Sequence, residues 1–416
     1  MNKEVMWTRR AMPALVGIAA TGMLLAGCAG DSGSGGEGGS ADPVQIGLIE
    51  PLSGPFADNG AQAEAGASLC VEQINAAGGI KSLDGAKLEL KVQDTGAAQP
   101  AQVANQAQSL IDNNSLSAII GAWASSYTLA IAPVAEQAGV PLVTESFADD
   151  IVAQGYTYTF KIPAPASVMG TRGVDVVLEL AKANDYEITT AAVVAENTSS
   201  GQVSAKAAAG QLEKLGIDVA VEEYFAPGLT DANSLAIKLL ADDPQFMFVQ
   251  AGLADMKILQ AALKAQGYSG PILGAGSALV NPDYFKTVGE PADGAFTSAG
   301  WNWDLPGAEQ FVEDFTKAHP EFDFPGQEAG EDCVAVYAIA AALEESGSRD
   351  PSAVRDAIAG LNITEGTAAM VASGKLAFDE NGQLADVTPV IVQWQDGKPR
   401  TVYPEDVATV DPVFKR

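Results

Sequence analysis

Residues 118–143, AIIGAWASSYTLAIAPVAEQAGVPLV, contain one complete cycle of the pattern that decides the fold. The short apolar run Ala118–Gly121 leads into a longer stretch, Ser126–Ala138, which is followed by a second apolar run, Pro141–Val143. Short apolar runs bounded by turn residues indicate buried strands, whereas the longer stretch between them has the length of a helix. Together they predict a βαβ unit, in which a crossover helix joins two parallel strands.

The same alternation extends in both directions from this unit. The further strands expected are Val44–Ile49, Leu88–Val92, Ala191–Ala195, Val219–Tyr224 and Phe246–Gln250. The helices expected between them are Gln62–Ala76, Pro100–Asp112, Ser167–Asn184, Gln202–Leu215, Ser234–Asp242 and Asp255–Gln266. This rhythm predicts an α/β protein in which parallel sheets are covered by helices on both faces.

One sheet does not easily hold this many strands, so we expect two lobes. Two prolines follow the expected strand Tyr158–Lys161, which places a first crossing between lobes near Ile162–Ala166. A second crossing is expected near Pro291–Gly294. The predicted boundaries are 44–162 and 294–385 for lobe 1, and 163–293 and 386–416 for lobe 2.

The C-terminal part is expected to form β structure. Residues Lys375–Phe378 and Val390–Trp394 have the character of strands, and the turn Asp379–Gly382 lies between them. Its Asn-Gly pair is a strong signal for a hairpin turn.

The first 27 residues have the layout of a secretory signal peptide. A basic tip with Arg9 and Arg10 precedes an apolar run that ends in Leu25-Ala26-Gly27-Cys28, which resembles a bacterial lipobox. In a lipobox, cleavage before the Cys leaves it N-terminal and lipid-modified. An ordinary signal peptide with a chance Cys, or an uncleaved membrane helix, is the alternative, and the arginine pair leaves both Sec and twin-arginine export open.

Residues 28–43 are small and rich in Gly and Ser, which predicts a flexible tether. We therefore expect the rest of the chain to be held at the extracytoplasmic face of the cell membrane by a lipid on Cys28.

Charge and histidine content exclude several classes of function. The chain has 23 Lys and Arg against 53 Asp and Glu, a formal net charge of −30, which disfavours nucleic acid as a partner. Its single histidine, His319, disfavours a His-based triad and a His-rich metal site. We expect no metal, no cofactor and no enzymatic activity.

Two cysteines remain once Cys28 is assigned to the lipid. Cys70 and Cys333 each lie on an apolar stripe with helical spacing. In an exported protein they form a candidate disulfide between two helices, and buried free thiols are the alternative.

Four ordered motifs resemble the type I periplasmic binding proteins, specifically the leucine/isoleucine/valine-binding family. They are Pro51–Pro55, Glu72–Ile80, Ala132–Pro141 and Phe378–Gly382. The resemblance covers essentially all of residues 44–400. It implies two doubly wound parallel-sheet lobes that are joined by a three-segment hinge and close on a small-molecule solute. It also implies an ABC permease/ATPase complex as partner, and we expect a monomer.

The end of strand Ala118–Gly121 is the first candidate binding element. Ser125 is expected to cap a helix that starts at about Ser126, and the unpaired N–H groups of such a start attract a carboxylate. In the family, the Ser matching Ser125 binds the carboxylate of the ligand; a cap without a ligand is the alternative. After the next strand, Ser146 and Phe147 stand where family members usually have a small residue and a Thr.

The second lobe departs from the family pattern. Gly252 and Gly276 stand where amino-acid-binding members place an aromatic residue and an acid for the ammonium group, and Ser200 replaces another aromatic residue. Because a buried ammonium needs a partner, the resemblance implies an aromatic or amide-type solute rather than an amino acid.

Several aromatic residues fall at or near strand ends, where they could line a pocket or pack the lobes: Phe56, Trp123, Trp301 and Trp303. Glu328 is a candidate to replace the missing acid, although a charge at a helix start is the more ordinary role. The candidate ligand-binding residues are therefore Phe56, Asn59, Trp123, Ala124, Ser125, Ser146, Phe147, Ser200, Gly252, Gly276, Trp301 and Glu328.

The expected function is an extracytoplasmic solute-binding lipoprotein of an ABC importer. The alternative is a lipoprotein that senses a ligand on the same scaffold and signals to a membrane receptor. An enzyme is disfavoured, since no nucleophile motif is present.

Overall fold

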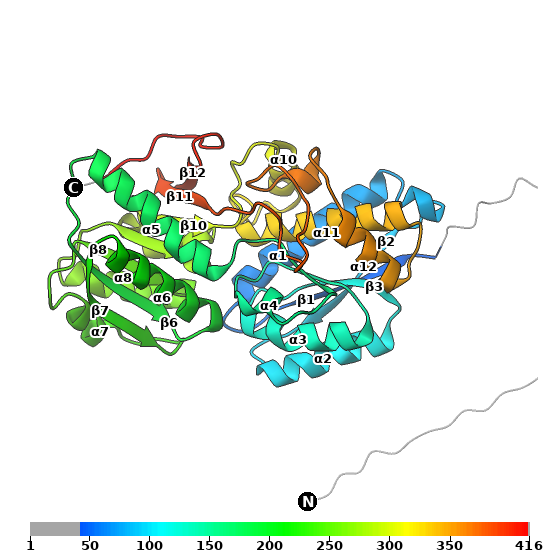
Figure 1. The fold of residues 1–416 in the computed structure, drawn as a ribbon, viewed down its shortest axis with the longest axis horizontal. Coiled ribbons are helices and arrows are strands. Elements are labelled where there is room, and N and C mark those ends of the chain that lie inside the picture. Colours follow the sequence, from blue (N-terminus) through cyan, green and yellow to red (C-terminus); the bar gives the residue numbers. More distant parts are fainter. Residues whose placement is uncertain (1–41, 415–416) are drawn as a thin grey trace, which may run out of the picture. The chain divides into compact units, whose positions relative to one another are not determined.

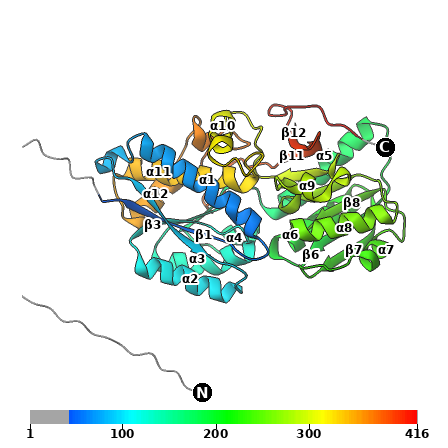
Figure 2. The ribbon, with the colours of Figure 1, turned by 180° about the vertical axis from the view of Figure 1, so that it is seen from behind.

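The computed structural model describes residues 42–414, and Figures 1 and 2 show these residues folded into two β-sheets with helices on both faces of each. The predicted signal peptide, Cys28 and nearly all of the predicted tether lie outside the described residues. Within them, no helix has the length and apolar character needed to cross a membrane.

The first sheet has five strands in the order β2-β1-β3-β4-β5, and all neighbours are parallel. Its strands are β1 (Val44–Glu50), β2 (Leu88–Asp94), β3 (Leu116–Gly121), β4 (Leu142–Thr144) and β5 (Thr159–Lys161). One face is covered by α1 (Ala57–Ala76), α11 (Gln327–Ser346) and α12 (Pro351–Gly360), and the other by α2 (Pro100–Asn113) and α3 (Ser125–Ala138). Shorter elements of this part are η1 (Lys81–Leu83), α4 (Asp150–Ala153), α10 (Glu309–Ala318) and η4 (Thr367–Ala369).

The second sheet has seven strands in the order β12-β11-β10-β9-β8-β6-β7. They are β6 (Thr190–Glu196), β7 (Asp218–Phe225), β8 (Phe246–Gln250), β9 (Ile272–Ala275), β10 (Phe296–Ala299), β11 (Val390–Gln395) and β12 (Lys398–Tyr403). The pairs β10–β11 and β11–β12 are antiparallel and the others are parallel. The flanking helices are α5 (Ala166–Ala183), α6 (Ser199–Lys214), α7 (Asn233–Leu239), η2 (Ser277–Val280), α8 (Leu253–Ala265), α9 (Tyr284–Val288) and η3 (Glu290–Ala292).

Coverage of both faces explains why the central strands are apolar throughout. In β1, Ile46 and Leu48 face the core beneath α1 and α11, whereas Ile49 faces the core beneath α2 and α3. Successive side chains of a strand point to opposite faces, so a strand buried on both sides has no polar alternation. This pattern confirms the predicted α/β class.

The observed strand membership corrects one predicted boundary. Strand β10 pairs with β9 and β11, so residues 294–299 belong to the second sheet and not to the first lobe. The chain returns to the first sheet after Ala299, rather than near Pro291–Gly294.

The chain passes between the two sheets at two other places. The chain leaves the first sheet between the end of β5 at Lys161 and the start of α5 at Ala166. It crosses again between Leu384, whose N–H donates to the Lys161 carbonyl at 2.8 Å, and the start of β11. The predicted turn before this crossing is present: Gly382 has φ +81° and its N–H donates to the Asp379 carbonyl at 3.0 Å.

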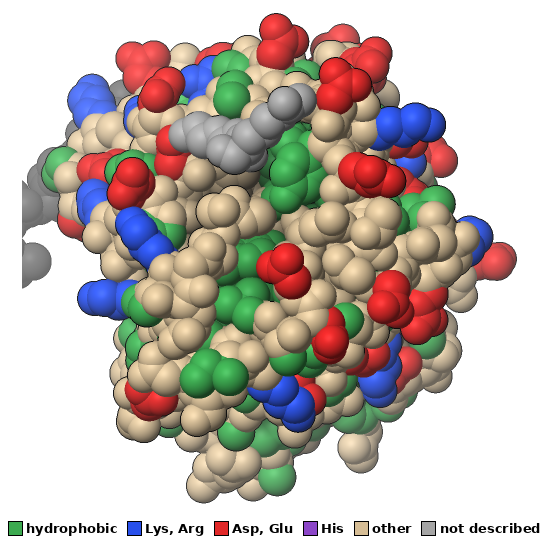
Figure 3. Space-filling model, turned by 90° about the vertical axis from the view of Figure 1, so that its left-hand side faces the viewer, with side chains coloured by type: hydrophobic (Ala, Val, Ile, Leu, Met, Phe, Trp, Pro, Cys, Tyr) green, Lys and Arg blue, Asp and Glu red, His purple; other side chains and the backbone are tan. Residues whose placement is uncertain are grey.

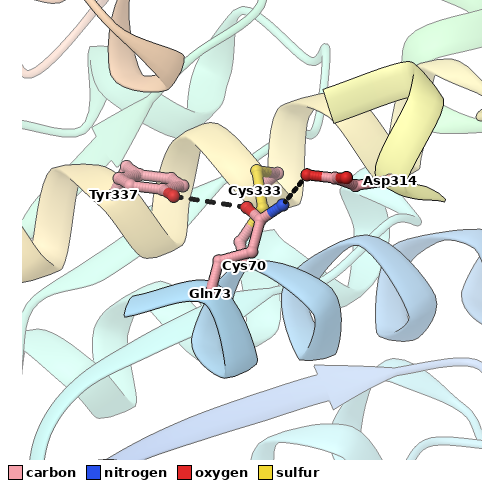
Figure 4. Close-up of a disulfide and its surroundings, with 5 residues drawn as sticks. All are labelled: Cys70, Gln73, Asp314, Cys333 and Tyr337. Atoms are coloured by element: carbon pink, nitrogen blue, oxygen red, sulfur yellow. Dashed lines mark hydrogen bonds between the residues drawn. A yellow bond between two sulfur atoms is a disulfide. The ribbon is translucent and has the colours of Figure 1, made fainter. Parts of the chain in front are cut away.

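Helices α1 and α11 pack closely along their lengths and are joined covalently (Figure 4). A disulfide links Cys70 to Cys333 across a Cα–Cα distance of 5.5 Å, which confirms the disulfide predicted between two helices. Beside it, Gln73 donates to Asp314 at 2.8 Å and accepts from the Tyr337 hydroxyl at 3.3 Å. A methyl group on Gly66 would lie 2.1 Å from the Ala329 carbonyl oxygen, so this approach requires glycine.

On the face shown in Figure 3, the negative charge is spread out. Acidic side chains are scattered over the face shown in Figure 3 and are interleaved with basic ones. This distribution is that of a solvated surface rather than of a single charged docking patch.

Candidate functional site

A cavity of about 220 Å³ lies where strand ends of the two sheets meet. Its first wall consists of residues that follow strands of the first sheet, and its second wall consists of residues at or after the ends of β6 and β8. They are Phe56, Ala98, Gln99, Pro100, Trp123, Ala124, Ser125, Ser126, Tyr127 and Phe147 in the first wall, and Glu196, Thr198, Ser199, Ser200 and Gln250 in the second. Carboxyl ends of parallel strands are where open α/β sheets bind ligands.

Position, rather than volume, identifies this cavity as the candidate site. A larger hollow of about 700 Å³ lies beside Trp303 and Thr316. None of the residues that line it lies at the carboxyl end of β3 or β6, so it is not placed where such sheets bind ligands. Known small-molecule sites span about 300–1,000 Å³, and this cavity of about 220 Å³ lies just below that range.

The N-terminus of α3 points its backbone donors at the cavity. The helix starts at Ser125 and its N-cap is Ala124, whose carbonyl accepts from the Tyr127 N–H at 2.8 Å. The prediction that Ser125 is the N-cap is therefore wrong by one residue, because the chain turns into the helix before it. The first N–H groups of a helix lack intrahelical acceptors, so those of Ser125 and Ser126 can bind an anionic group.

The Ser125 hydroxyl group can still donate a hydrogen bond to a ligand. Its Oγ accepts from the Ala148 N–H at 3.2 Å, which fixes the side chain, and the residue is 6% exposed at the cavity wall. A hydroxyl is one donor with two acceptor sites, so this contact leaves the donor unused.

Ser146 is placed behind the wall rather than in it. Its hydroxyl donates to the Ala122 carbonyl, lies 2.8 Å from the Thr128 hydroxyl and is fully buried. Ser146 therefore holds the β3–α3 turn together and does not line the cavity.

Asn59 and Glu328 also lie behind the wall, where they hold Trp123. One oxygen of Glu328 accepts from Asn59 Nδ2 at 2.8 Å and from the Trp123 indole N–H at 2.9 Å. Burial raises the pKa of Glu328, and these two donors lower it. Phe56 packs on Trp123 with ring centroids 4.9 Å apart, so the two rings form an aromatic wall.

Glu196 is the acidic residue that the sequence analysis missed. It ends β6, is 6% exposed and lines the cavity from the second sheet. Its pKa is raised to about 7, mainly by burial and also by the charge of Asp255, although the Gly252 N–H, 2.5 Å from Oε1, lowers it. The sequence did contain a signal for this residue, because Glu196 is an acidic residue directly after the apolar run Ala191–Ala195, at the end of the expected strand.

Ser200 lies in the cavity as expected, in the first turn of α6. The N-cap of this helix is Thr198, whose hydroxyl accepts from the Gly201 N–H at 3.2 Å. Helices α3 and α6 therefore both begin at the cavity, one from each sheet.

The two glycines of the second lobe do not open space for a ligand. A methyl group on Gly276 would lie 3.0 Å from the Phe147 ring, and one on Gly252 would lie 3.2 Å from Glu196 Oε1. Phe147 and Glu196 thus occupy the space next to these glycines, and neither glycine lines the cavity.

The two other candidate tryptophans, Trp301 and Trp303, do not line the cavity. Trp301 is 1% exposed and packs edge-on against Phe311 in the core of the first sheet, with centroids 5.9 Å apart. Its placement as a ligand-binding residue is therefore wrong, because the chain has already turned into this core after β10. Trp303 donates to the Pro399 carbonyl at 2.8 Å and stacks near Phe324.

Three comparisons with known proteins agree with this geometry. The model of a family described as periplasmic binding protein matches residues 43–399. The Leu/Ile/Val-binding protein homolog 8 of Brucella melitensis biotype 1 is 28% identical over 386 residues, which cover 90% of this chain and 93% of the relative. The leucine-, isoleucine-, valine-, threonine- and alanine-binding protein of Pseudomonas aeruginosa is also 28% identical, with 87% and 92% covered.

Two solved structures share the fold. The branched-chain amino acid transporter substrate-binding protein LivJ of Streptococcus pneumoniae, in complex with isoleucine, has a TM-score of 0.74 at 22% identity and covers 86% of this chain and 98% of its own. The solute-binding protein of an ABC transporter from Rhodopseudomonas palustris, in complex with 3,4-dihydroxybenzoic acid, has a TM-score of 0.74 at 22% identity, with 89% and 98% covered. At these identities the likeness establishes the fold alone.

Proposed function

This chain belongs to the family of periplasmic binding proteins, and from that premise we propose that it is the extracytoplasmic solute-binding lipoprotein of an ABC importer. The relatives reported above are binding proteins rather than enzymes. The observation that carries the proposal is the cavity between the ends of β3 and β6, which is lined from both sheets.

The proposed mechanism is closure of two lobes, each built on one sheet, around the solute. The solute docks first on the wall with Ser125, and the wall with Glu196 then closes over it. Three crossings connect the sheets, at residues 162–165, at residue 300 and at residues 385–389, and few-residue connections of this kind serve as hinges. Closure excludes water, which strengthens each polar contact in the site.

The proposed solute has an acceptor end, an apolar body and a donor group. The acceptor end binds the N-terminus of α3, and the body contacts Phe56, Trp123 and Phe147. Gly252 and Gly276 spoke against an ammonium group in the sequence, but the carboxylate of Glu196 lines the cavity and can pair with one. The donor facing Glu196 is therefore an ammonium or an amide N–H.

Native mass spectrometry of freshly purified protein, followed by calorimetry, tests this proposal. We expect a bound small molecule, or binding of a solute from one of three classes: aromatic carboxylates, amides and branched-chain amino acids. A broad solute screen without any binding would contradict the proposed function.

Uptake separates import from the alternative, a sensor that signals to a membrane receptor. Cells that lack this protein are expected to lose uptake of the labelled solute. Unchanged uptake, together with a lost transcriptional response to the solute, would favour the sensor.

A further inference from the structure

Five acidic side chains are buried together behind the cavity wall. They are Glu50 at the end of β1, Glu145 after β4, and Glu328, Glu331 and Asp332 on α11, and each is at most 2% exposed. Among the described residues, no ion pair involves any of the five. The nearby Lys161 donates instead to the carbonyls of Phe147 and Ala148, at 3.0 and 3.2 Å.

Three of these acids converge on one point. Glu50, Glu145 and Asp332 each offer a carboxylate oxygen, and the three oxygens lie within 4.8 Å of one another. Acidic side chains often cluster in proteins. The convergence would therefore not indicate a ligand site if hydrogen-bond donors already satisfied these oxygens.

Their lack of donors is the second observation. Five of the six carboxylate oxygens of these three residues are buried without a hydrogen-bond partner, and the sixth, Glu50 Oε2, accepts from the Trp123 N–H at 3.0 Å. Fully buried, unpartnered polar atoms are rare in native proteins, because desolvation then goes uncompensated. A ligand that compensates these oxygens must be cationic, or the carboxyl groups must share protons.

We propose that Glu50, Glu145 and Asp332 form a site for one Ca²⁺ ion. Carboxylate oxygens are the ligands that Ca²⁺ prefers, at about 2.3–2.6 Å, so two oxygens on opposite sides of the ion lie about 4.6–5.2 Å apart. The three oxygens lie within 4.8 Å of one another, so no pair of them exceeds the upper end of that span. These ligands come from three elements far apart in the chain, so no pattern of neighbouring residues predicts the site.

The site borders the wall that holds the solute. Glu50 binds the Trp123 N–H, and the Trp123 indole N–H binds Glu328, so a cation at Glu50 fixes the position of Trp123.

Metal analysis and thermal melting test the proposal directly. We expect the purified protein, stripped with chelator and dialysed against millimolar CaCl2, to retain one calcium per chain and to melt several degrees higher than the stripped protein. Glu145→Gln and Asp332→Asn are expected to lose both the calcium and the shift. Glu72→Gln is the matched control, since Glu72 is exposed on α1 away from the site, and it should behave as the parent protein.

A second measurement needs only the unaltered protein, in case the variants do not fold. Terbium, which replaces Ca²⁺, is expected to give tryptophan-sensitised luminescence that calcium removes by competition. If the unaltered protein retains no calcium and gives no such signal, the acids share protons and the proposal is wrong. Calcium retained at parent level by both Glu145→Gln and Asp332→Asn would also overturn it.

Discussion

Ser125 and Ser146 lie close together at the ends of adjacent strands, yet their hydroxyl groups are used differently. The Ser146 hydroxyl donates to the Ala122 carbonyl and also hydrogen-bonds with the Thr128 hydroxyl. The Ser125 hydroxyl accepts one backbone N–H and keeps its hydrogen for a ligand at the cavity wall. The orientation of the side chain thus separates a serine that can still donate a hydrogen bond at the cavity wall from a structural one.

Ser125→Ala is expected to weaken binding of a carboxylate solute about tenfold or more. A hydrogen bond to a charged group contributes about 1.5–3 kcal/mol, and about 1.4 kcal/mol corresponds to a factor of ten. Calorimetry measures the affinity, and a melting curve tests whether loss of the Ala148 contact destabilises the fold. Ser109→Ala, at an exposed position on α2, is the control. Equal affinity in the two variants would remove Ser125 from the site.

Glu196 makes binding of an amine solute depend on pH. Burial raises its pKa to about 7, so the carboxylate that attracts an ammonium forms only as the pH rises through that value. The affinity for an amine solute is therefore expected to increase from pH ~6 to ~8, and Glu196→Gln should abolish the increase. Calorimetry across this range checks it, and the same pH profile in both proteins would contradict the assignment.

The raised pKa of Glu196 also affects the stability of the solute-free protein. The unfolded chain ionises near the ordinary value of 4.5 and the folded chain near 7, so the folded state binds more protons between these values. This contribution to stability is present at low pH and is lost as the pH rises through about 7. Glu196→Gln should remove it from melting curves recorded over that range.

The proposed attachment of the protein to the membrane depends on a lipid carried by Cys28. Cys28→Ala is expected to prevent lipid attachment, so the protein should move from the membrane fraction to the soluble extracytoplasmic fraction. Fractionation with an antibody measures this, and membrane association that persists in the variant would contradict the lipid anchor.

At the scale of elements, length and regularity decided what could be predicted. The predicted strand Phe246–Gln250 matches β8, and the predicted helix Pro100–Asp112 matches α2 to within one residue. Strands β9, β10 and β12 were not predicted; β9 and β10 have four residues each, and Pro399 interrupts β12. These short strands become stable only through their neighbours in the sheet.

The disulfide between α1 and α11 is expected to stabilise the fold considerably. It closes a segment of 263 residues, and disulfides typically contribute about 2–4 kcal/mol, with longer loops contributing more. The double variant Cys70→Ala, Cys333→Ala should therefore melt several degrees lower. Gln73→Ala, which removes only the neighbouring hydrogen bonds, should lower the melting temperature less. A double variant that melts like the parent protein would show that the disulfide does not stabilise the fold.

At the scale of the whole molecule, closure of the two lobes should be visible in solution. The radius of gyration from X-ray scattering is expected to decrease when a binding solute is added, because the two cavity walls approach each other. Ser125→Ala at the same solute concentration is the control and should show a smaller decrease. An unchanged radius at saturating solute would contradict hinge closure.

The sequence by itself determined the α/β class, the alternation of strands and helices, and the positions of Trp123 and Ser125 just after a strand end, because each depends on patterns within a few consecutive turns of chain. Ser200 was a candidate through the family resemblance alone. The tertiary structure alone decided that Glu196 faces this cavity, that Trp301 is buried in a core, and that Glu50, Glu145 and Asp332 converge. These outcomes depend on how distant strand ends are brought together in space. Local periodicity fixes which face of an element is buried, but it carries no information about which other element will cover that face.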